Sequence, residues 1–243
     1  MTLSIHRPRG GLSIGATMLA IFVFVIATTA SAAQISSGSV LSASRTAIDT
    51  QSGVHVVFTA HSGSTGIAEK IVADVGTTAG SETIFEGSAD VAIKLTPTFA
   101  YVSGNQSGLT TLFGMSSAIA KKLGDRWESW KVGTGQYKNL ESDLTMRSVT
   151  TLLPRAKGSK ASTVVRHGMT MYLLTWNTPK SGSVPKLSNS LVVSAQGPAL
   201  PSLKSAIASD GTKITTALSK WGESVGVQAP PSNRTISSSK LGN

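Results

Sequence analysis

The sequence contains no cysteine, so no disulfide bond staples the fold and no thiol is present to carry a lipid anchor. Charged residues are also scarce, at 14% of the chain, compared with about 25% in an average soluble protein. Serine, threonine, glycine and alanine are abundant instead, a composition typical of β-rich proteins outside the cytoplasm. Packing of an apolar core must therefore stabilise the protein.

Acidic residues are absent before Asp49 and again between Asp143 and Asp210. The second stretch either is a solvated basic surface or attracts an anionic envelope polymer or lipid headgroups. Nucleic acid is a poor candidate partner, because the sequence lacks a basic helix and an interleaved aromatic pattern. The basic residues of this stretch are Arg147, Arg155, Lys157, Lys160, Arg166, Lys180, Lys186 and Lys204.

The amino terminus has the three parts of an export signal. Residues 6–9 form a short basic region, and an apolar stretch follows from residue 12 to about residue 27. This stretch, roughly 15 residues long, is shorter than the roughly 20 that a permanent transmembrane helix needs. It ends in small residues that permit cleavage after Ala32 or Ala33. We expect residues 1–33 to be a signal peptide and the mature protein to be secreted into the cell envelope.

In the sequence after residue 33 we expect one domain, residues 53–230. A polar lead-in at 34–52 would precede it, and a disordered tail at 231–243 would follow it. Alternating apolar residues and short Gly-Ser turns predict an antiparallel meander. A His167-Gly168 turn predicts a hairpin. The expected strands are 53–61, 70–75, 83–85 with 89–95, 99–102, 161–166, 169–176 and 190–194, with two edge strands at 213–218 and 223–228.

Two helices are predicted between the strands. Apolar residues recur every three or four positions over 109–123, where Gly124 supplies a stop. A second helix is expected over 137–153, because Pro154 ends the periodic pattern. An amphipathic helix on a curved sheet either fills the core or lines a cavity for an apolar ligand.

Motifs for catalysis and metal binding are weak. The strings at 63–66 and 104–108 lack the spacing of a nucleophile elbow. His55 and His61 would share a strand face, but no further metal ligand is evident. The carboxylates Glu82 and Glu86 are best explained as solvated. The sequence therefore predicts no enzyme and no cofactor, although an enzyme of unrecognised type remains an alternative.

Six short motifs stand out along the central and final parts of the sequence. They are AYVSGN at 100–105, GLTTLFG at 108–114, AIA at 118–120, DRW at 125–127, YKNL at 137–140 and WGESVGVQAP at 221–230. These motifs resemble those of the actinobacterial cell-envelope lipoproteins of the LppX and LprG type. That family is similar in fold to the LolA and LolB carriers, an antiparallel half-barrel closed by helices over an apolar cavity. The resemblance implies binding or carriage of acylated lipids, although the family's lipid-attachment cysteine is missing.

Together these patterns predict an α+β fold with one strongly curved antiparallel sheet and two or more helices on its concave face. We expect a monomeric, non-enzymatic protein that holds an acylated lipid or another apolar ligand between sheet and helices. The alternative is a structural or adhesive wall protein whose basic half binds anionic polymer. The candidate lining residues are Leu109, Leu112, Phe113, Met115, Ile119 and Trp127, and the candidate headgroup contacts are Lys121, Lys122 and Arg126.

Overall fold

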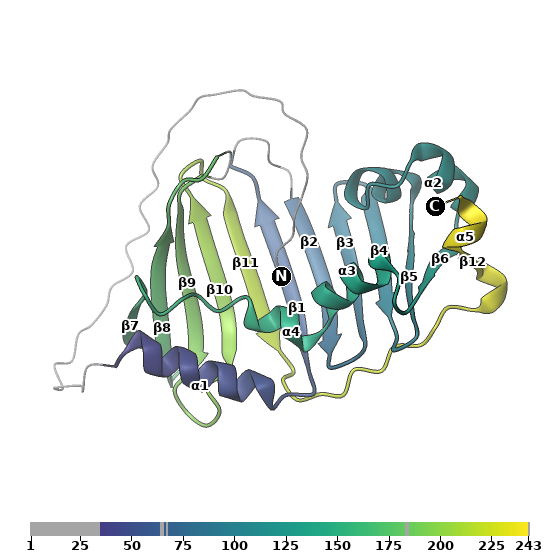
Figure 1. Ribbon diagram of the computed structural model, residues 1–243. Coiled ribbons are helices and arrows are strands. Elements are labelled where there is room, and N and C mark those ends of the chain that lie inside the picture. Colours follow the sequence, from purple (N-terminus) through teal and green to yellow (C-terminus); the bar gives the residue numbers. More distant parts are fainter. Residues whose placement is uncertain (1–34, 64–65, 67, 183–184, 243) are drawn as a thin grey trace.

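A computed structural model describes residues 35–63, 66, 68–182 and 185–242 of the chain. The expected signal peptide, residues 1–33, lies outside the described residues. The described residues form a single 12-stranded sheet. Helices lie on one side of it, which is the architecture that the sequence predicted (Figure 1). The strands run in the order β12-β6-β5-β4-β3-β2-β1-β11-β10-β9-β8-β7, and the sheet stays open, with β12 and β7 at its edges.

All pairs of neighbouring strands are antiparallel except β12 and β6, which are parallel. The pairing of β1 with β11 joins the two halves of the chain at the middle of the sheet. The strands are β1 (Gly53–His61), β2 (Ala68–Gly76), β3 (Gly80–Glu86), β4 (Ala89–Leu95), β5 (Phe99–Gly104), β6 (Trp127–Lys131), β7 (Lys160–Arg166), β8 (Met169–Thr178), β9 (Leu187–Ser194), β10 (Pro201–Ala208), β11 (Lys213–Ser219) and β12 (Thr235–Ser237).

Helices α1, α4 and α3 cross in front of the sheet in Figure 1, from the β7 edge towards β5. They cover the concave face, which is the arrangement that the sequence predicted. The helices are α1 (Ser37–Asp49), the π-helix η1 (Gly108–Leu112), α2 (Ser117–Leu123), α3 (Gly135–Leu144), α4 (Met146–Thr150), the 3-10 helix η2 (Ser232–Arg234) and α5 (Ser238–Leu241). No helix within the described ranges is both long and apolar enough to cross a bilayer.

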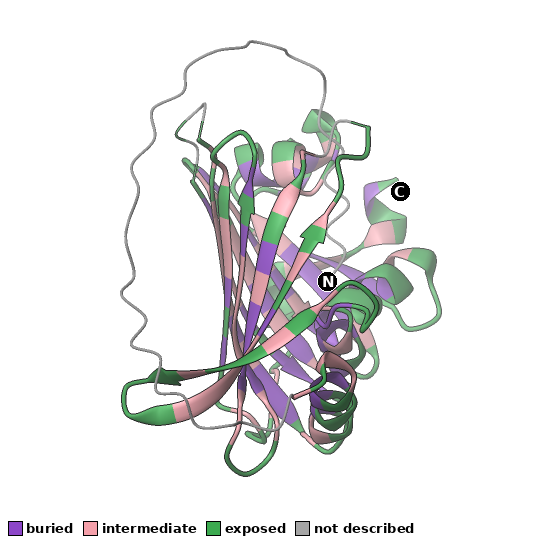
Figure 2. Ribbon diagram, turned by 90° about the vertical axis from the view of Figure 1, so that its left-hand side faces the viewer, coloured by how far each residue is buried: buried purple, intermediate pink, exposed green. Residues whose placement is uncertain are grey.

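The core consists of two clusters of buried apolar side chains. The first cluster joins α1 and α4 to β1, β2, β8, β9 and β11, and includes Leu41, Leu191 and Leu218. The second cluster joins η1, α2, α3 and α5 to β4, β5 and β6, and includes Leu109 and Trp130. Buried and less buried residues alternate along the strands, as the colours of Figure 2 show, because successive side chains point to opposite faces.

Helix α1 occupies the segment that was expected to be a polar lead-in. Ser36 caps it, since its Oγ accepts a hydrogen bond from the backbone N–H of Ser39 at 3.0 Å. The buried residues Val40, Leu41 and Ile48 share one face of the helix and belong to the first cluster. Ser39 and Ser42 are exposed, whereas Ser44 is buried beside these residues, so the serine-rich composition concealed the apolar stripe.

The predicted helix over 109–123 is interrupted. Gly114, with a φ of +76°, separates the π-helix η1 from α2, a conformation that glycine adopts without strain. Ser116 then caps α2 by accepting a hydrogen bond from the Ile119 N–H, and Gly124 ends the helix as predicted. The predicted helix over 137–153 is also divided, because Thr145 is extended and forms an isolated parallel bridge with Gly76.

The carboxyl-terminal segment differs from the prediction of a disordered tail. Through residue 242 it forms η2, β12 and α5, and Leu241 is buried in the second cluster. Arg234 anchors the segment by donating hydrogen bonds to the backbone O of Asp125 at 2.8 Å and to Oδ2 of Asp125 at 2.7 Å. Pairing with β6 therefore orders a segment whose polar composition suggested disorder.

Two further expectations about strands are wrong. The strand at 213–218 is not an edge strand, because β11 lies between β1 and β10. The segment 223–228 forms no strand, and its Val225 lies against Gly53 and Gly76 instead. Strand β10, which no sequence pattern indicated, takes the place beside β11.

Candidate ligand-binding face

The concave face of the sheet can be followed from strand to strand through the pairing register. Val56 pairs with Leu218, and Leu174 pairs with Leu191, and all four belong to the first cluster beneath α1 and α4. Directly paired residues lie on the same face, as do residues two positions apart. The concave face therefore includes every second residue counted from these four.

Apolar side chains continue along this face beyond the cover of α1 and α4. Ile71 is fully buried, although it belongs to neither cluster, and it pairs with Phe58 on one side and Ile84 on the other. Other concave side chains are large or apolar and only partly buried. These are Phe58, Ala60, Ile84 and Ile214, together with Tyr172 and Trp176, which pack against the first cluster. The face thus presents apolar surface from β8 to β3.

The structure brings five of the six predicted lining residues together in the second cluster. Leu109 and Met115 are buried, while Leu112, Phe113 and Ile119 are partly buried against it. Phe113 contacts Trp130, with ring centroids 5.8 Å apart. Helix η1 can approach β4 closely because residue 108 is glycine, where a Cβ atom would clash with the backbone carbonyl of Asp90.

Trp127, the sixth predicted lining residue, lies on the opposite face of the sheet. Trp130 pairs with Ala100 of the second cluster, and Trp127 is three positions before it, so the strand's alternation separates the two indoles. Lys94 Nζ lies 5.2 Å from the centre of a Trp127 ring, a cation–π contact on the convex face. A spacing of three residues places two side chains on opposite faces of a strand, and the structure shows this segment to be the strand β6.

Two of the three predicted headgroup contacts are engaged with backbone carbonyls. Lys122 Nζ donates a hydrogen bond to the backbone O of Lys240 at 3.0 Å. Arg126 donates to the backbone O of Leu123 at 3.1 Å and also to that of Lys122, so its guanidinium caps the end of α2. Lys121 is exposed to solvent.

Carboxyl side chains lie on the concave face, where the sequence interpretation placed none. Glu82, which was expected to be solvated, is only 6% exposed and lies between Ala73 and Ile93. Burial, followed by repulsion from Asp143 and Glu69, raises the pKa of Glu82 to about 7. Within the described chain, Oε2 of Glu82 has no hydrogen-bond partner. Glu82 is therefore partly protonated near neutral pH.

A lysine, Lys204 of β10, also lies on the concave face, on the half of the sheet away from Glu82. It pairs with Leu191 and with Thr216, which place it on this face. Its Nζ lies 5.9 Å from the centre of a Trp176 ring. Burial lowers the pKa of Lys204. The other seven basic residues of the stretch that lacks acidic residues are exposed, so Lys204 alone among the eight turns inward.

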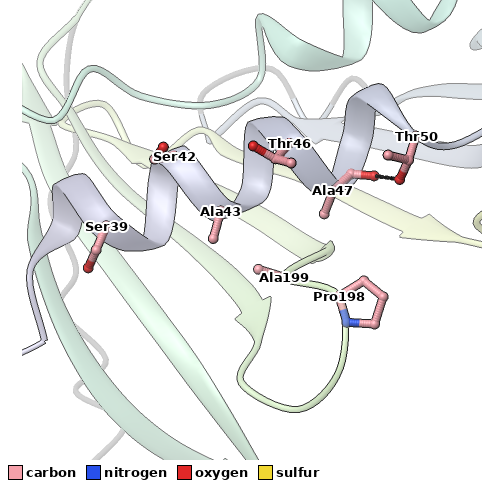
Figure 3. A pocket seen from close by; sticks show the side chains of 8 residues that line it. All are labelled: Ser39, Ser42, Ala43, Thr46, Ala47, Thr50, Pro198 and Ala199. Carbon is pink, nitrogen blue, oxygen red and sulfur yellow. Dashed lines mark hydrogen bonds between the residues drawn. The ribbon is translucent and has the colours of Figure 1, made fainter.

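A separate groove lies outside the sheet, between α1 and the loop before β10 (Figure 3). Its volume is about 600 Å³, and it is wide open to solvent. Small side chains line it, and Thr50 Oγ1 is occupied by a hydrogen bond to the backbone O of Ala47 at 2.8 Å. The lining residues are Ser39, Ser42, Ala43, Thr46, Ala47, Thr50, Pro198 and Ala199. With neither large apolar nor charged side chains, this groove is the weaker candidate.

The two histidines of β1, His55 and His61, lie on the convex face of the sheet. His55 Nδ1 lies 2.7 Å from Oδ1 of Asp74 on the convex face. In the part of the chain that the structure describes, no group of three or more His, Cys, Asp or Glu residues is arranged to hold a metal ion.

The sequence matches no protein-family model and no curated protein. Among solved structures it is similar to the lipoprotein LppX of Mycobacterium tuberculosis, with 18% identity and a TM-score of 0.48 over 79% of this chain and 100% of that chain. It is also similar to LprF of Mycobacterium bovis, with 14% identity and a TM-score of 0.48 over 79% of this chain and 95% of that chain. A LolA superfamily protein of Nitrosomonas europaea is a more distant match, with 10% identity and a TM-score of 0.27 over 82% of this chain and 96% of that chain.

The resemblance to LppX-type proteins that the motifs indicated is thus found among solved structures as well. These likenesses are distant, with TM-scores below 0.5.

Proposed function

We propose that this protein binds an acylated lipid or another apolar ligand on the concave face of its sheet. One observation carries the proposal. Large apolar side chains, among them Phe58, Tyr172 and Trp176, lie on this face and remain only partly buried. Apolar surface that the fold leaves incompletely covered is stabilised when a ligand removes it from water, by about 25 cal/mol for each Å² buried.

The ligand would lie between the two apolar clusters, across β1, β2 and β3. Phe58 and Ile84, which flank the buried Ile71, would form the floor. Leu112, Phe113 and Ile119 would border it from the side of η1 and α2. Helices α1 and α4 would border it from the other side. Binding of this kind needs no cofactor and no catalytic step.

We also propose that the protein works outside the cytoplasm. The predicted signal peptide at 1–33 would deliver a monomer to the extracytoplasmic envelope, where acylated lipids are present. Trp127, Lys121, Lys122 and Arg126 are not part of the proposed binding surface, because the first lies on the convex face and the others lie at the end of α2.

A matched pair of substitutions tests the proposal. Phe58 lies on the concave face of β1, whereas Phe85 is 42% exposed on the convex face of β3, where it pairs with Lys70. We expect Phe58→Asp to weaken binding of the neutral fluorescent probe N-phenyl-1-naphthylamine by about tenfold or more, because a carboxylate would be buried against the apolar probe. Phe85→Asp should leave the dissociation constant within about twofold of the wild type.

The dependence of binding on ionic strength distinguishes this proposal from the alternative of a wall protein that binds anionic polymer. Burial of an apolar chain is nearly independent of ionic strength, whereas binding through exposed lysines and arginines falls steeply as salt rises. Titrations of the probe at low and high salt should therefore give the same dissociation constant.

Equal affinities of both aspartate variants and the wild type for the probe would contradict the proposed site, provided that circular dichroism shows all three proteins to be folded.

A further inference from the structure

Charge is divided unevenly over the concave face. On the five strands β7 to β11, Lys204 is the one charged residue at a concave position, counted through the pairing register. On the strands from β1 to β6, the charged residues at concave positions are all acidic. These are Glu69, Glu82, Glu86 and Glu128.

The surroundings of Lys204 are apolar or neutral. Its paired neighbours Leu191 and Thr216 are buried, and Ala206, two positions along β10, is 7% exposed. Lys204 itself is partly buried, and burial lowers the pKa of its ammonium group. Within the described residues, Lys204 forms no ion pair and no hydrogen bond.

An ammonium group in such a place is unfavourable unless an anion joins it, because burial weakens its hydration. Among the described residues, the ring of Trp176 is the group recorded in contact with this charge, through the cation–π interaction. Asn189 is held beside Trp176, since its Nδ2 donates hydrogen bonds to the Trp176 backbone O at 3.4 Å and to Thr178 Oγ1 at 3.1 Å. These contacts fix the polar surroundings and leave the charge of Lys204 without a counter-ion.

We propose that Lys204 binds the anionic group of the acylated ligand, a carboxylate or a phosphate, at the Trp176 side of the concave face. The apolar chain would then extend from Lys204 towards Phe58 and Ile84. This inference rests on the proposed function, because it orients a ligand on the same face. The carboxylates on β2, β3 and β6 would repel an anion placed in the opposite orientation.

Three ligands of equal chain length test the proposal: palmitate, hexadecyl phosphate and hexadecanol, each titrated below its micelle concentration. We expect the wild type to bind the two anionic ligands at least about tenfold more tightly than the alcohol, since a charge-assisted hydrogen bond is worth about that factor. Lys204→Met keeps the length of the stem and removes the charge. It should abolish the preference while leaving hexadecanol binding unchanged, and Lys204→Arg should retain the preference.

Lys213→Met provides the matched control, because Lys213 lies on the neighbouring strand β11, is exposed and points to the convex face. This variant should keep the full preference for the anions. Inorganic phosphate alone, without a chain, should compete only weakly, whereas strong competition would show that a free anion is the natural occupant.

The outcomes distinguish failure of this inference from failure of the proposed function. If no chain binds, including hexadecanol, the proposed function is wrong. If all three chains bind equally to the wild type and to Lys204→Met, the chain site stands and the headgroup assignment is wrong. If Lys213→Met loses the preference as strongly as Lys204→Met, general surface charge explains it and the assignment to Lys204 is also wrong.

Discussion

The two parts of the concave face use similar apolar packing but opposite charges. The part that lies beneath α1 and α4 has the single cation Lys204, and the part beneath η1, α2 and α3 includes the buried acid Glu82. Neither group forms a salt bridge among the described residues. The difference indicates that the sheet is polarised along its width, which would orient a ligand that has one charged end and one apolar end.

The largest effect on stability is expected when a buried leucine is truncated in either part. Leu41 of α1 and Leu123 of α2 are both fully buried, one in each cluster. Truncation of either to alanine should lower the free energy of unfolding by about 3 kcal/mol, the cost of lost burial and an unfilled cavity. Urea denaturation followed by circular dichroism measures both variants.

The control is Ser42→Ala on the outer face of α1, which should change the free energy of unfolding by less than about 0.5 kcal/mol. A loss below about 1 kcal/mol for Leu41→Ala would show that α1 is not an integral part of the fold. Separate transitions for the two variants would show that the two clusters unfold independently.

The second effect concerns the charge of Glu82. Its pKa in the folded protein, about 7, is higher than the ordinary value of 4.5, so the folded state binds the proton more tightly than the unfolded state. Stability is therefore greatest below pH 4.5 as far as this group is concerned, and it falls as the pH rises through 7. The total change approaches about 3 kcal/mol, from about 1.4 kcal/mol for each pKa unit.

Glu82→Gln should remove this loss between about pH 5 and pH 8, because glutamine stays neutral throughout. Glu86→Gln is the matched control, since Glu86 lies on the same strand and face but is more exposed. Thermal melting across this pH range gives the comparison. An unchanged pH profile in Glu82→Gln would contradict the burial of a carboxyl group on this side of the face.

The smallest of the three effects is expected when the hydroxyl group of a tyrosine is removed, and one tyrosine from each part gives the comparison. Tyr137 of α3 is 2% exposed, and its hydroxyl donates a hydrogen bond to the backbone O of Thr96 at 3.0 Å. Tyr137→Phe should lower the free energy of unfolding by about 1 kcal/mol. Tyr172→Phe should have little effect, because the Tyr172 hydroxyl forms no hydrogen bond within the described chain. Equal losses in both variants would contradict this difference between the two parts.

Local periodicity was sufficient to predict the strands and the hairpin with regular alternation. The strand over 53–61 and the turn at His167-Gly168 were both confirmed, with positive φ at both turn residues. The apolar residues of η1 and α2 were also identified, although not the break at Gly114. These features depend on neighbours along the chain, which sequence patterns record directly.

Features that depend on distant partners could not be predicted in this way. The inward direction of Lys204 requires the register of β10 with β9 and β11, and β10 has no clear alternation of its own. The burial of Glu82 requires the cover of α3 and the pairing of β3 with β4. The ordered structure of the segment after Pro230 depends on the pairing of β12 with β6. A sequence alone does not specify such pairings.

Native mass spectrometry is the most direct test of the central claim, that the concave face holds an apolar ligand. The wild-type protein and Phe58→Asp would be purified from the envelope of their own host and measured before and after extraction with organic solvent. We expect the wild type to have an additional mass that extraction removes and that corresponds to an acylated lipid, and we expect the variant to lack it. The same bare protein mass for both proteins before extraction would contradict the account.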